Sequence, residues 1–108
     1  KLFLITGSPG GSDIPAAILR VITGVIDFDL DIGEATMLPR IHKDWPYTGL
    51  EHERAVSRDI VRRLKSMGHE TEYETTIGST QSIHIVDGIN NGFADLRRPN
   101  AGVSVQSN

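Results

Sequence analysis

The segment from Thr6 to Ser12, with the sequence TGSPGGS, holds the residues best suited to chemistry in this chain. Gly10 and Gly11 lack a Cβ, so they can adopt positive φ and leave their N–H groups uncovered. A predicted strand, Leu2 to Ile5, precedes the segment, and a predicted helix follows it. At a helix N-terminus such amides join the unpaired donors and the positive end of the dipole. We therefore predict a site for negative charge: a phosphate, a carboxylate or the oxyanion of an acyl transfer.

Known anion-binding and nucleophile motifs fit this segment incompletely. A P-loop needs a lysine after its last glycine, but Ser12 and Asp13 follow Gly11, and the Gly-x-Gly-x-x-Gly fingerprint is absent. The nucleophile elbow Gly-x-Ser-x-Gly is nearly met, with Thr6 in place of its first glycine. Asp13 would also repel a resident anion. A permanent phosphate site is therefore disfavoured, and a tight turn without chemistry stays open as the alternative.

Composition narrows the class of protein. A chain of 108 residues predicts one domain with a modest core. A net charge of −3 without a basic stripe argues against nucleic acid as a partner. No apolar run reaches the ~20 residues that a membrane span requires. The absence of cysteine excludes disulfides, thiolate metal sites and a cysteine nucleophile.

Apolar periodicity places the helices and strands. Isoleucine, valine and alanine recur at steps of three and four over residues 13–28, which predicts a helix with Ser12 as its N-cap and Pro15 in its first turn. Gly24 inside this helix indicates close packing. The other predicted elements are helices over 32–38 and 57–67, and strands over 50–53, 70–75, 82–86 and 92–95. This order favours an α/β (α+β) fold, with helices on one face of a mostly antiparallel sheet.

Local signals refine the second half of the chain. Ser57 is the predicted N-cap of the helix over 57–67, and Gly68 its left-handed C-terminal residue. Asp87 and Gly88 predict a hairpin turn. The buried face of that helix is expected to consist of Ile60, Val61 and Leu64.

Three groups of polar residues are interpreted as ordinary surface features, and we predict neither a metal nor a cofactor. Metal-ligand spacing is absent among the four histidines: His42, His52, His69 and His84. Two of them, His42 and His52, are placed in an irregular region. The carboxylates after the first helix lack the spacing of a calcium loop: Asp27, Asp29, Asp31 and Glu34. The remaining cations are assigned to a solvated helix face or turn: Arg62, Arg63, Lys65, Arg97 and Arg98.

Several segments together resemble one family, the γ-glutamyltranspeptidases. They occur in the order found in that family: Leu4–Ser12, Ile26–Asp27, Ile32–Ala35, Pro39–His42, Trp45, Gly78–Ile83, Asp95 and Arg97. The resemblance covers almost the whole chain and corresponds to the C-terminal part of the small subunit. It implies a partial N-terminal-nucleophile hydrolase fold, in which two sheets lie between helix layers.

The resemblance also implies a chemistry. Members are made as precursors that cleave themselves, and the new N-terminal threonine attacks γ-glutamyl amides such as glutathione. The acyl group then passes to water, an amino acid or a peptide. The amides of two adjacent glycines form the oxyanion hole, and these match Gly10 and Gly11, with Gly11 also at the substrate. No cofactor or metal is implied.

Several parts of the family's active site lie outside this sequence. The nucleophile and the residues that hold the γ-glutamyl group lie upstream or in the large subunit, whereas Thr6, Thr36 and Thr80 are internal. The chain opens on Lys1 inside a predicted strand, so we expect a piece of a longer protein. Its expected partners are the rest of the small subunit, the large subunit and a γ-glutamyl substrate. The isolated chain is expected to be inactive.

Some positions depart from the family pattern. The segment from Asp44 to Glu51 differs from it, and Leu96 replaces a common proline. Members are mostly exported, so the resemblance implies a periplasmic or extracellular parent.

Two other interpretations stay open. The chain can be a non-catalytic module that binds a small anion at the glycine loop, or a purely structural domain. As a fragment of the family's sandwich, the chain would have a sheet edge exposed by removal of the rest, which favours a dimer of the fragment.

Overall fold

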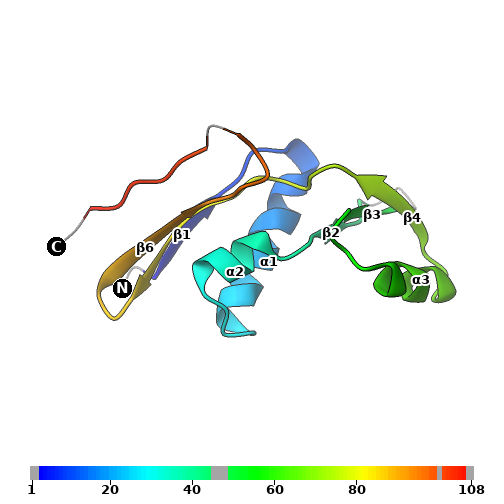
Figure 1. Cartoon of the computed structure of the whole chain (residues 1–108), viewed down its shortest axis with the longest axis horizontal. Helices are drawn as coiled ribbons and strands as arrows, with labels where there is room; N and C mark the ends of the chain where they lie inside the picture. Colours follow the sequence, from blue (N-terminus) through cyan, green and yellow to red (C-terminus); the bar gives the residue numbers. More distant parts are fainter. Residues whose placement is uncertain (1–2, 45–48, 100, 107–108) are drawn as a thin grey trace. The chain divides into compact units, whose positions relative to one another are not determined.

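The computed structural model describes residues 3–44, 49–99 and 101–106 (Figure 1). The chain divides into two compact units, whereas the sequence led us to expect one domain. The first unit comprises residues 1–38 and 78–108, and the second comprises residues 39–77. Lys1, the first residue of the predicted strand (Leu2), and the family position Trp45 lie outside the described residues.

The first unit contains a three-stranded antiparallel sheet. Its strands, β1 (Leu4–Gly7), β5 (Gln81–Val86) and β6 (Ile89–Ala94), lie in the order β1-β5-β6. The register places Ile5 opposite Ile83 and Ser82 opposite Phe93. Asp87 and Gly88 form the predicted turn between β5 and β6, with φ of 50° and 78°. Positive φ at both turn residues suits a two-residue hairpin.

Two helices of the first unit pack against this sheet (Figure 1). They are α1 (Ile14–Ile26) and α2 (Ile32–Met37), and a short 3₁₀ turn, η1 (Gly11–Asp13), precedes α1. The core joins both helices to the sheet through Val21, Val25, Ile32 and Ala35, with Leu4, Leu30 and Phe93 against them. A Cβ built on Gly24 would lie 2.9 Å from the Cβ of Ala35, which confirms the close packing predicted there.

The helix N-termini differ in part from expectation. The prediction of Ser12 as N-cap is wrong, because Ser12 lies inside η1 and Asp13 takes the cap position, although its side chain does not cap the helix. Pro15 lies in the first turn of α1, as predicted. Asp31 and Glu34 form a capping box: Glu34 N donates to Asp31 Oδ1 at 2.7 Å, and Asp31 N donates to Glu34 Oε1 at 3.2 Å. These two carboxylates therefore begin α2 rather than merely solvating a loop.

The second unit combines a small mixed sheet with one helix. Its strands are β2 (Ile41–His42), β3 (Gly49–Glu53) and β4 (Glu70–Glu74), and its helix is α3 (Arg58–Ser66). β2 and β3 are antiparallel, whereas β3 and β4 are parallel with α3 between them in sequence. The predicted mostly antiparallel α/β fold is confirmed, with this one parallel pairing. His42 lies in β2, so its predicted placement in an irregular region is wrong. His52 lies in β3, which matches the strand predicted over 50–53 and not the irregular region assigned to this histidine.

Helix α3 has the predicted ends but not the predicted buried face. Ile60 N donates to the Ser57 side chain at 3.3 Å, and Gly68 has a φ of +98°. Within the described structure no α3 residue is buried, and Ile60 is 51% exposed. The small three-stranded sheet of this unit leaves every residue of α3 at least partly exposed. No helix among the described residues has the length and apolarity needed to cross a bilayer.

Candidate active site

The backbone of the glycine loop adopts conformations that few residues other than glycine accept. Gly10 has φ +132° and ψ 15°, and Gly11 has φ +58°. L-residues avoid the first conformation almost entirely, and only Asn and Asp enter the second with any frequency. The strand β1 ends at Gly7, so residues 8–10 alone turn the chain into η1. Both predicted site glycines therefore lie where the chain changes direction.

The amides of this loop are available to a ligand. Gly10 and Gly11 are both exposed, and a Cβ built on Gly11 would meet nothing within 4 Å. The carbonyl of Gly10 accepts a hydrogen bond from Asp13 N at 3.1 Å. Within the described part of the chain, neither Gly10 N nor Gly11 N donates a hydrogen bond. The loop thus presents two adjacent unpaired donors beside open space.

Ser8 ties the loop to the segment that precedes β5. Its Oγ accepts a hydrogen bond from Ser79 N at 3.0 Å and donates one to the Pro9 carbonyl at 2.7 Å. A Cβ built on Gly10 would lie 3.7 Å from Gly78 Cα, so the two backbones run close together here. Ser79 is nearly fully buried, which makes this contact a fixed point for the loop.

Buried polar contacts hold that second segment in turn. Thr80 N donates to Asp95 Oδ2 at 3.0 Å, and Asp95 N donates to the Thr80 carbonyl at 2.9 Å. The other carboxylate oxygen of Asp95 accepts from Arg97 Nη1 at 3.0 Å. Thr80 and Asp95 are buried, so these bonds are shielded from water. The glycine loop therefore rests on a chain of hydrogen bonds that extends to the end of β6.

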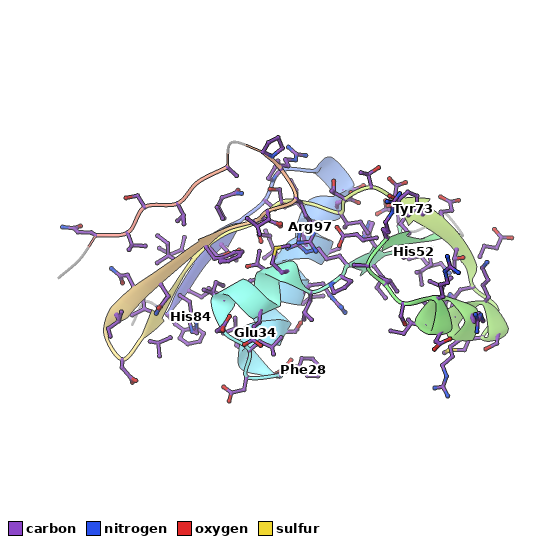
Figure 2. The ribbon with its side chains drawn as sticks, in the orientation of Figure 1. Phe28, Glu34, His52, Tyr73, His84 and Arg97 are labelled. Atoms are coloured by element: carbon purple, nitrogen blue, oxygen red, sulfur yellow. The ribbon has the colours of Figure 1, made fainter. Side chains whose placement is uncertain are left out.

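Arg97, labelled in Figure 2, connects this series of hydrogen bonds to helix α2. Its Nη1 donates to the Thr36 carbonyl at 2.7 Å, and its Nη2 donates to the Leu38 carbonyl at 2.8 Å. The Arg97 side chain is 7% exposed, so its interpretation as part of a solvated turn is wrong. Arg98 is exposed, as expected. The guanidinium thus donates hydrogen bonds to carbonyls at the C-terminus of α2, where the helix dipole favours a positive charge.

The electrostatics of the loop suit a transient charge better than a resident one. Asp13 follows the loop, and its Cβ would lie 3.5 Å from a Cβ on Gly10. The acidic residue two positions after Gly11 disfavours a resident dianion at the loop. Backbone amides that point at a developing oxyanion stabilise it although the loop carries no net positive charge. The arrangement therefore fits acyl-transfer chemistry more closely than permanent phosphate binding.

His84, the histidine of the first unit, takes no part in these contacts. His84 lies in β5, is 9% exposed, and packs edge-on against the Phe3 ring at 4.8 Å between centroids (Figure 2). Its Nε2 has no hydrogen-bond partner among the described residues. The expectation of a surface or edge histidine is therefore wrong for His84. Strand alternation alone did not show which face of β5 is covered.

The second unit contains a buried polar cluster that the sequence did not reveal. Glu53 accepts hydrogen bonds from Arg40 N and Ile77 N, each at 2.8 Å, and Arg40 Nη1 donates to the Ile77 carbonyl at 2.9 Å. Arg40 and Ile77 are fully buried. This cluster joins the two ends of the second unit.

Comparison with known proteins identifies the family of the chain. The family model for gamma-glutamyltranspeptidase matches residues 1–105. The chain belongs to this family. A glutathione hydrolase proenzyme from Escherichia coli K12 is 39% identical over 98 residues, which cover 90% of this chain and 17% of that protein. A glutathione hydrolase proenzyme from Bacillus subtilis 168 is 32% identical over 108 residues, covering 97% of this chain and 18% of that protein.

A solved member of the γ-glutamyltranspeptidase family shares the fold. The structure of a Helicobacter pylori gamma-glutamyltranspeptidase mutant superposes with a TM-score of 0.86 at 34% identity, covering 91% of this chain and 55% of that one. The predicted family and the predicted α/β fold of N-terminal-nucleophile hydrolase type are thereby confirmed. The chain spans less than a fifth of the length of its curated relatives.

Proposed function

We propose that this chain is the C-terminal portion of the small subunit of a γ-glutamyltransferase or glutathione hydrolase. Its family membership and its match to about a sixth of two glutathione hydrolase proenzymes support this. In this proposal the precursor cleaves itself, and the new N-terminal threonine attacks a γ-glutamyl amide such as glutathione. The rest of the small subunit and the large subunit supply that nucleophile and most contacts to the substrate.

Within this enzyme the glycine loop forms the oxyanion hole. The observation that carries this role is the pair of exposed, consecutive positive-φ glycines whose N–H groups are unused within the described chain. Gly10 and Gly11 would donate to the oxygen of the tetrahedral intermediate, and Gly11 would also contact the bound γ-glutamyl carbonyl. In other enzymes, removing one such donor lowers kcat by roughly 10²–10³-fold.

The test uses a graft, because the nucleophile must be present. The 108 residues replace the matching segment of the E. coli relative, and turnover of a chromogenic γ-glutamyl anilide is measured. Gly10→Ala should then lower kcat by about 10²-fold or more, because the φ of +132° at that position cannot be kept and the donor moves. Gly7→Ala is the matched control, since its Cβ meets nothing within 4 Å and its φ is not positive.

An unchanged kcat in Gly10→Ala with only a lower melting temperature would contradict the oxyanion role, because that is what a purely structural domain predicts. A separate prediction concerns the isolated chain, and turnover of the anilide by it above the buffer blank would contradict its expected inactivity. The isolated chain should be inactive because Thr6, Thr36 and Thr80 are internal and lack the free α-amine that serves as base.

The alternative of a non-catalytic anion-binding module makes a different prediction. It requires the isolated chain to bind a small anion tightly at the loop, which phosphate or glutamate titration of the Gly10 and Gly11 amides by NMR would show. A catalytic oxyanion hole needs only weak ground-state binding, because its donors act on charge that develops in the transition state. The nearby Asp13 favours the catalytic role.

The isolated chain is also expected to dimerise through a sheet edge. β1 pairs with β5 on one side only within the described first unit, so its other side presents free backbone groups. Elution volumes in size-exclusion chromatography at two protein concentrations check this, and identical monomeric volumes at both would contradict it.

A further inference from the structure

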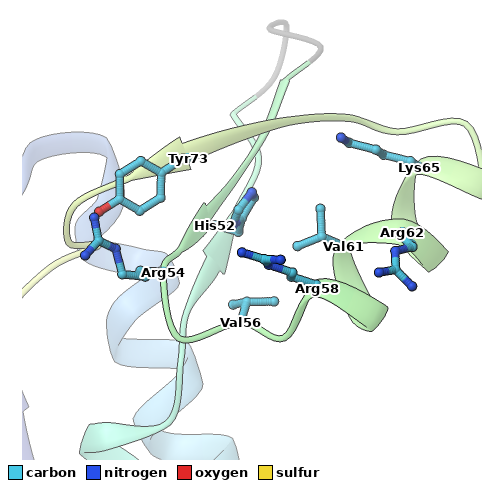
Figure 3. Close-up of a pocket in the computed structure, with 8 residues that line it drawn as sticks. All are labelled: His52, Arg54, Val56, Arg58, Val61, Arg62, Lys65 and Tyr73. Carbon is cyan, nitrogen blue, oxygen red and sulfur yellow. The ribbon is translucent and has the colours of Figure 1, made fainter.

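The second unit holds a cavity of about 450 Å³ that the proposed function does not use (Figure 3). It lies between helix α3 and the strand pair β3–β4. Buried Val56 and half-buried Val61 provide apolar lining. The polar lining is cationic or aromatic and comprises His52, Arg54, Arg58, Arg62, Lys65 and Tyr73. No carboxylate lines this cavity among the described residues.

Helix and strand periodicity bring these side chains together. Arg58, Arg62 and Lys65 are spaced by four and three residues, so they share one face of α3. His52 of β3 lies opposite Tyr73 of β4 in the parallel register, and both side chains line the cavity. Helix α3 and the two strands therefore supply most of the lining, and Arg54 and Val56 in the segment between β3 and α3 supply the rest.

Three of the four cations at the cavity lack an acidic partner. Within the described part of the chain, Arg54, Arg58 and Lys65 form no ion pair. Arg62 also lines the cavity, but its charge is paired with Asp59 at 3.2 Å. Arg58 points toward His52 in Figure 3. The positive charge of the cavity is thus concentrated in three side chains.

The acidic residues of β4 lie on the other side of the sheet. A Cβ built on Gly49 would collide with the carboxylate of Glu72, so Glu72 covers Gly49. Side chains alternate along a strand, which places Glu72 opposite the face that carries Tyr73. The sheet therefore separates an acidic face from the cationic cavity.

An aromatic contact orders one of the cations. The guanidinium carbon of Arg54 lies 5.5 Å from the centroid of the Tyr73 ring, within the range of a cation–π interaction. The His52 ring lies 6.3 Å from the same ring. Arg54 is thus held at the cavity by a contact that does not neutralise its charge.

We propose that this cavity binds a phosphate group. A phosphate monoester carries about 1.5 to 2 negative charges at pH 7 and three terminal oxygens, which can accept from several cations at once. A single carboxylate is satisfied by one guanidinium in a bidentate pair and would leave the other cations without a partner. Because the cavity shares no residue with the glycine loop, this assignment does not depend on the proposed enzymatic role.

NMR titration of the 108-residue chain at constant ionic strength tests the assignment. Inorganic phosphate and ribose 5-phosphate are the probes, and glutarate is the dicarboxylate for comparison. We expect saturable amide shifts at Arg54, Arg58 and Lys65 with both phosphates and a weaker response to glutarate. Tighter binding of the ester would identify it as the source of the phosphate, and tighter binding of inorganic phosphate would identify the free ion. No saturable shift, or equal affinity for glutarate, would overturn the proposal.

Matched variants separate a site from general electrostatic attraction. Arg58→Ala should weaken phosphate binding by about tenfold or more, since a hydrogen bond to a charged group is lost. Arg63→Ala removes the same charge from the same helix at an exposed position outside the cavity, and it should leave the affinity nearly unchanged. Lys65→Ala gives an independent second variant at the cavity. Equal losses in Arg58→Ala and Arg63→Ala would overturn the assignment.

Discussion

Two regions of this chain are suited to negative charge, and they use opposite means. The glycine loop of the first unit offers backbone amides without net charge, fixed by Ser8 and the buried chain of bonds behind it. The cavity of the second unit offers full charges on exposed side chains such as Arg58. Fixed dipoles suit a charge that appears briefly at one point, whereas mobile cations suit a ligand that arrives already charged.

The same contrast separates two arginine–aspartate pairs. Arg97 and Asp95 form a pair whose side chains are 7% and 0% exposed, and each makes further hydrogen bonds. Arg62 and Asp59 form a pair on α3 whose side chains are 75% and 88% exposed. Removing one partner of a buried pair leaves an unsatisfied charge, whereas solvent screens an exposed pair. Burial rather than pairing decides how much each region tolerates change.

Asp95→Ala should have the largest effect on stability. It leaves the Arg97 guanidinium buried without its carboxylate and frees Thr80 N, so the free energy of unfolding should fall by about 3–5 kcal/mol. Asp59→Ala, the control on the exposed pair, should cost less than about 1 kcal/mol. Urea denaturation of both variants measures the difference. Similar losses would remove the distinction between the two pairs.

Ser8→Ala should have an intermediate effect. It removes the acceptor of Ser79 N, a donor on a buried residue, so unfolding should become easier by about 1–3 kcal/mol. Ser66→Ala is the control, because Ser66 Oγ donates to the Arg63 carbonyl at an exposed helix end and should matter by less than about 0.5 kcal/mol. In the graft, Ser8→Ala should also lower kcat. A kcat unchanged while stability falls would show that Ser8 does not position the loop.

Arg58→Ala should have the smallest effect. The side chain is exposed and forms no ion pair among the described residues, so the free energy of unfolding should change by no more than about 0.5 kcal/mol either way. Thermal denaturation in phosphate-free buffer measures it. If phosphate at about 20 mM raises the melting temperature of the parent chain but not of this variant, the result supports charge-based ligand binding in the second unit. A large loss without phosphate would show that Arg58 is structural.

Local signals predicted most of the elements and the position of the candidate site. Proline and two glycines after an apolar run sufficed for the loop, and Ser57 and Gly68 marked the ends of α3. The N-cap at Ser12 was predicted wrongly because the chain inserts a 3₁₀ turn before α1, and such a turn leaves no distinct signal in the sequence. Local rules therefore located the loop but not its detailed geometry.

Contacts between distant residues were the part that the sequence did not show. Arg97 meets carbonyls 59 and 61 positions away, and Glu53 meets an amide 24 positions away. Both residues look like surface charges in isolation, because their burial depends on partners that no local pattern specifies. The cationic cavity was missed for the same reason. The sequence assigns its helix residues to a solvated face, because the strands that line the other side of the cavity are identified only by the fold.

Because Gly24 and Ala35 are in close contact, a substitution at one position requires a compensating substitution at the other. With 2.9 Å between the Ala35 methyl and the place of a methyl on position 24, only one of the two helices can carry a side chain at the crossing. An exchange of the pair, Gly24→Ala together with Ala35→Gly, would keep the same volume at the interface. Each half of that exchange made alone would either crowd the crossing or leave a hole in it.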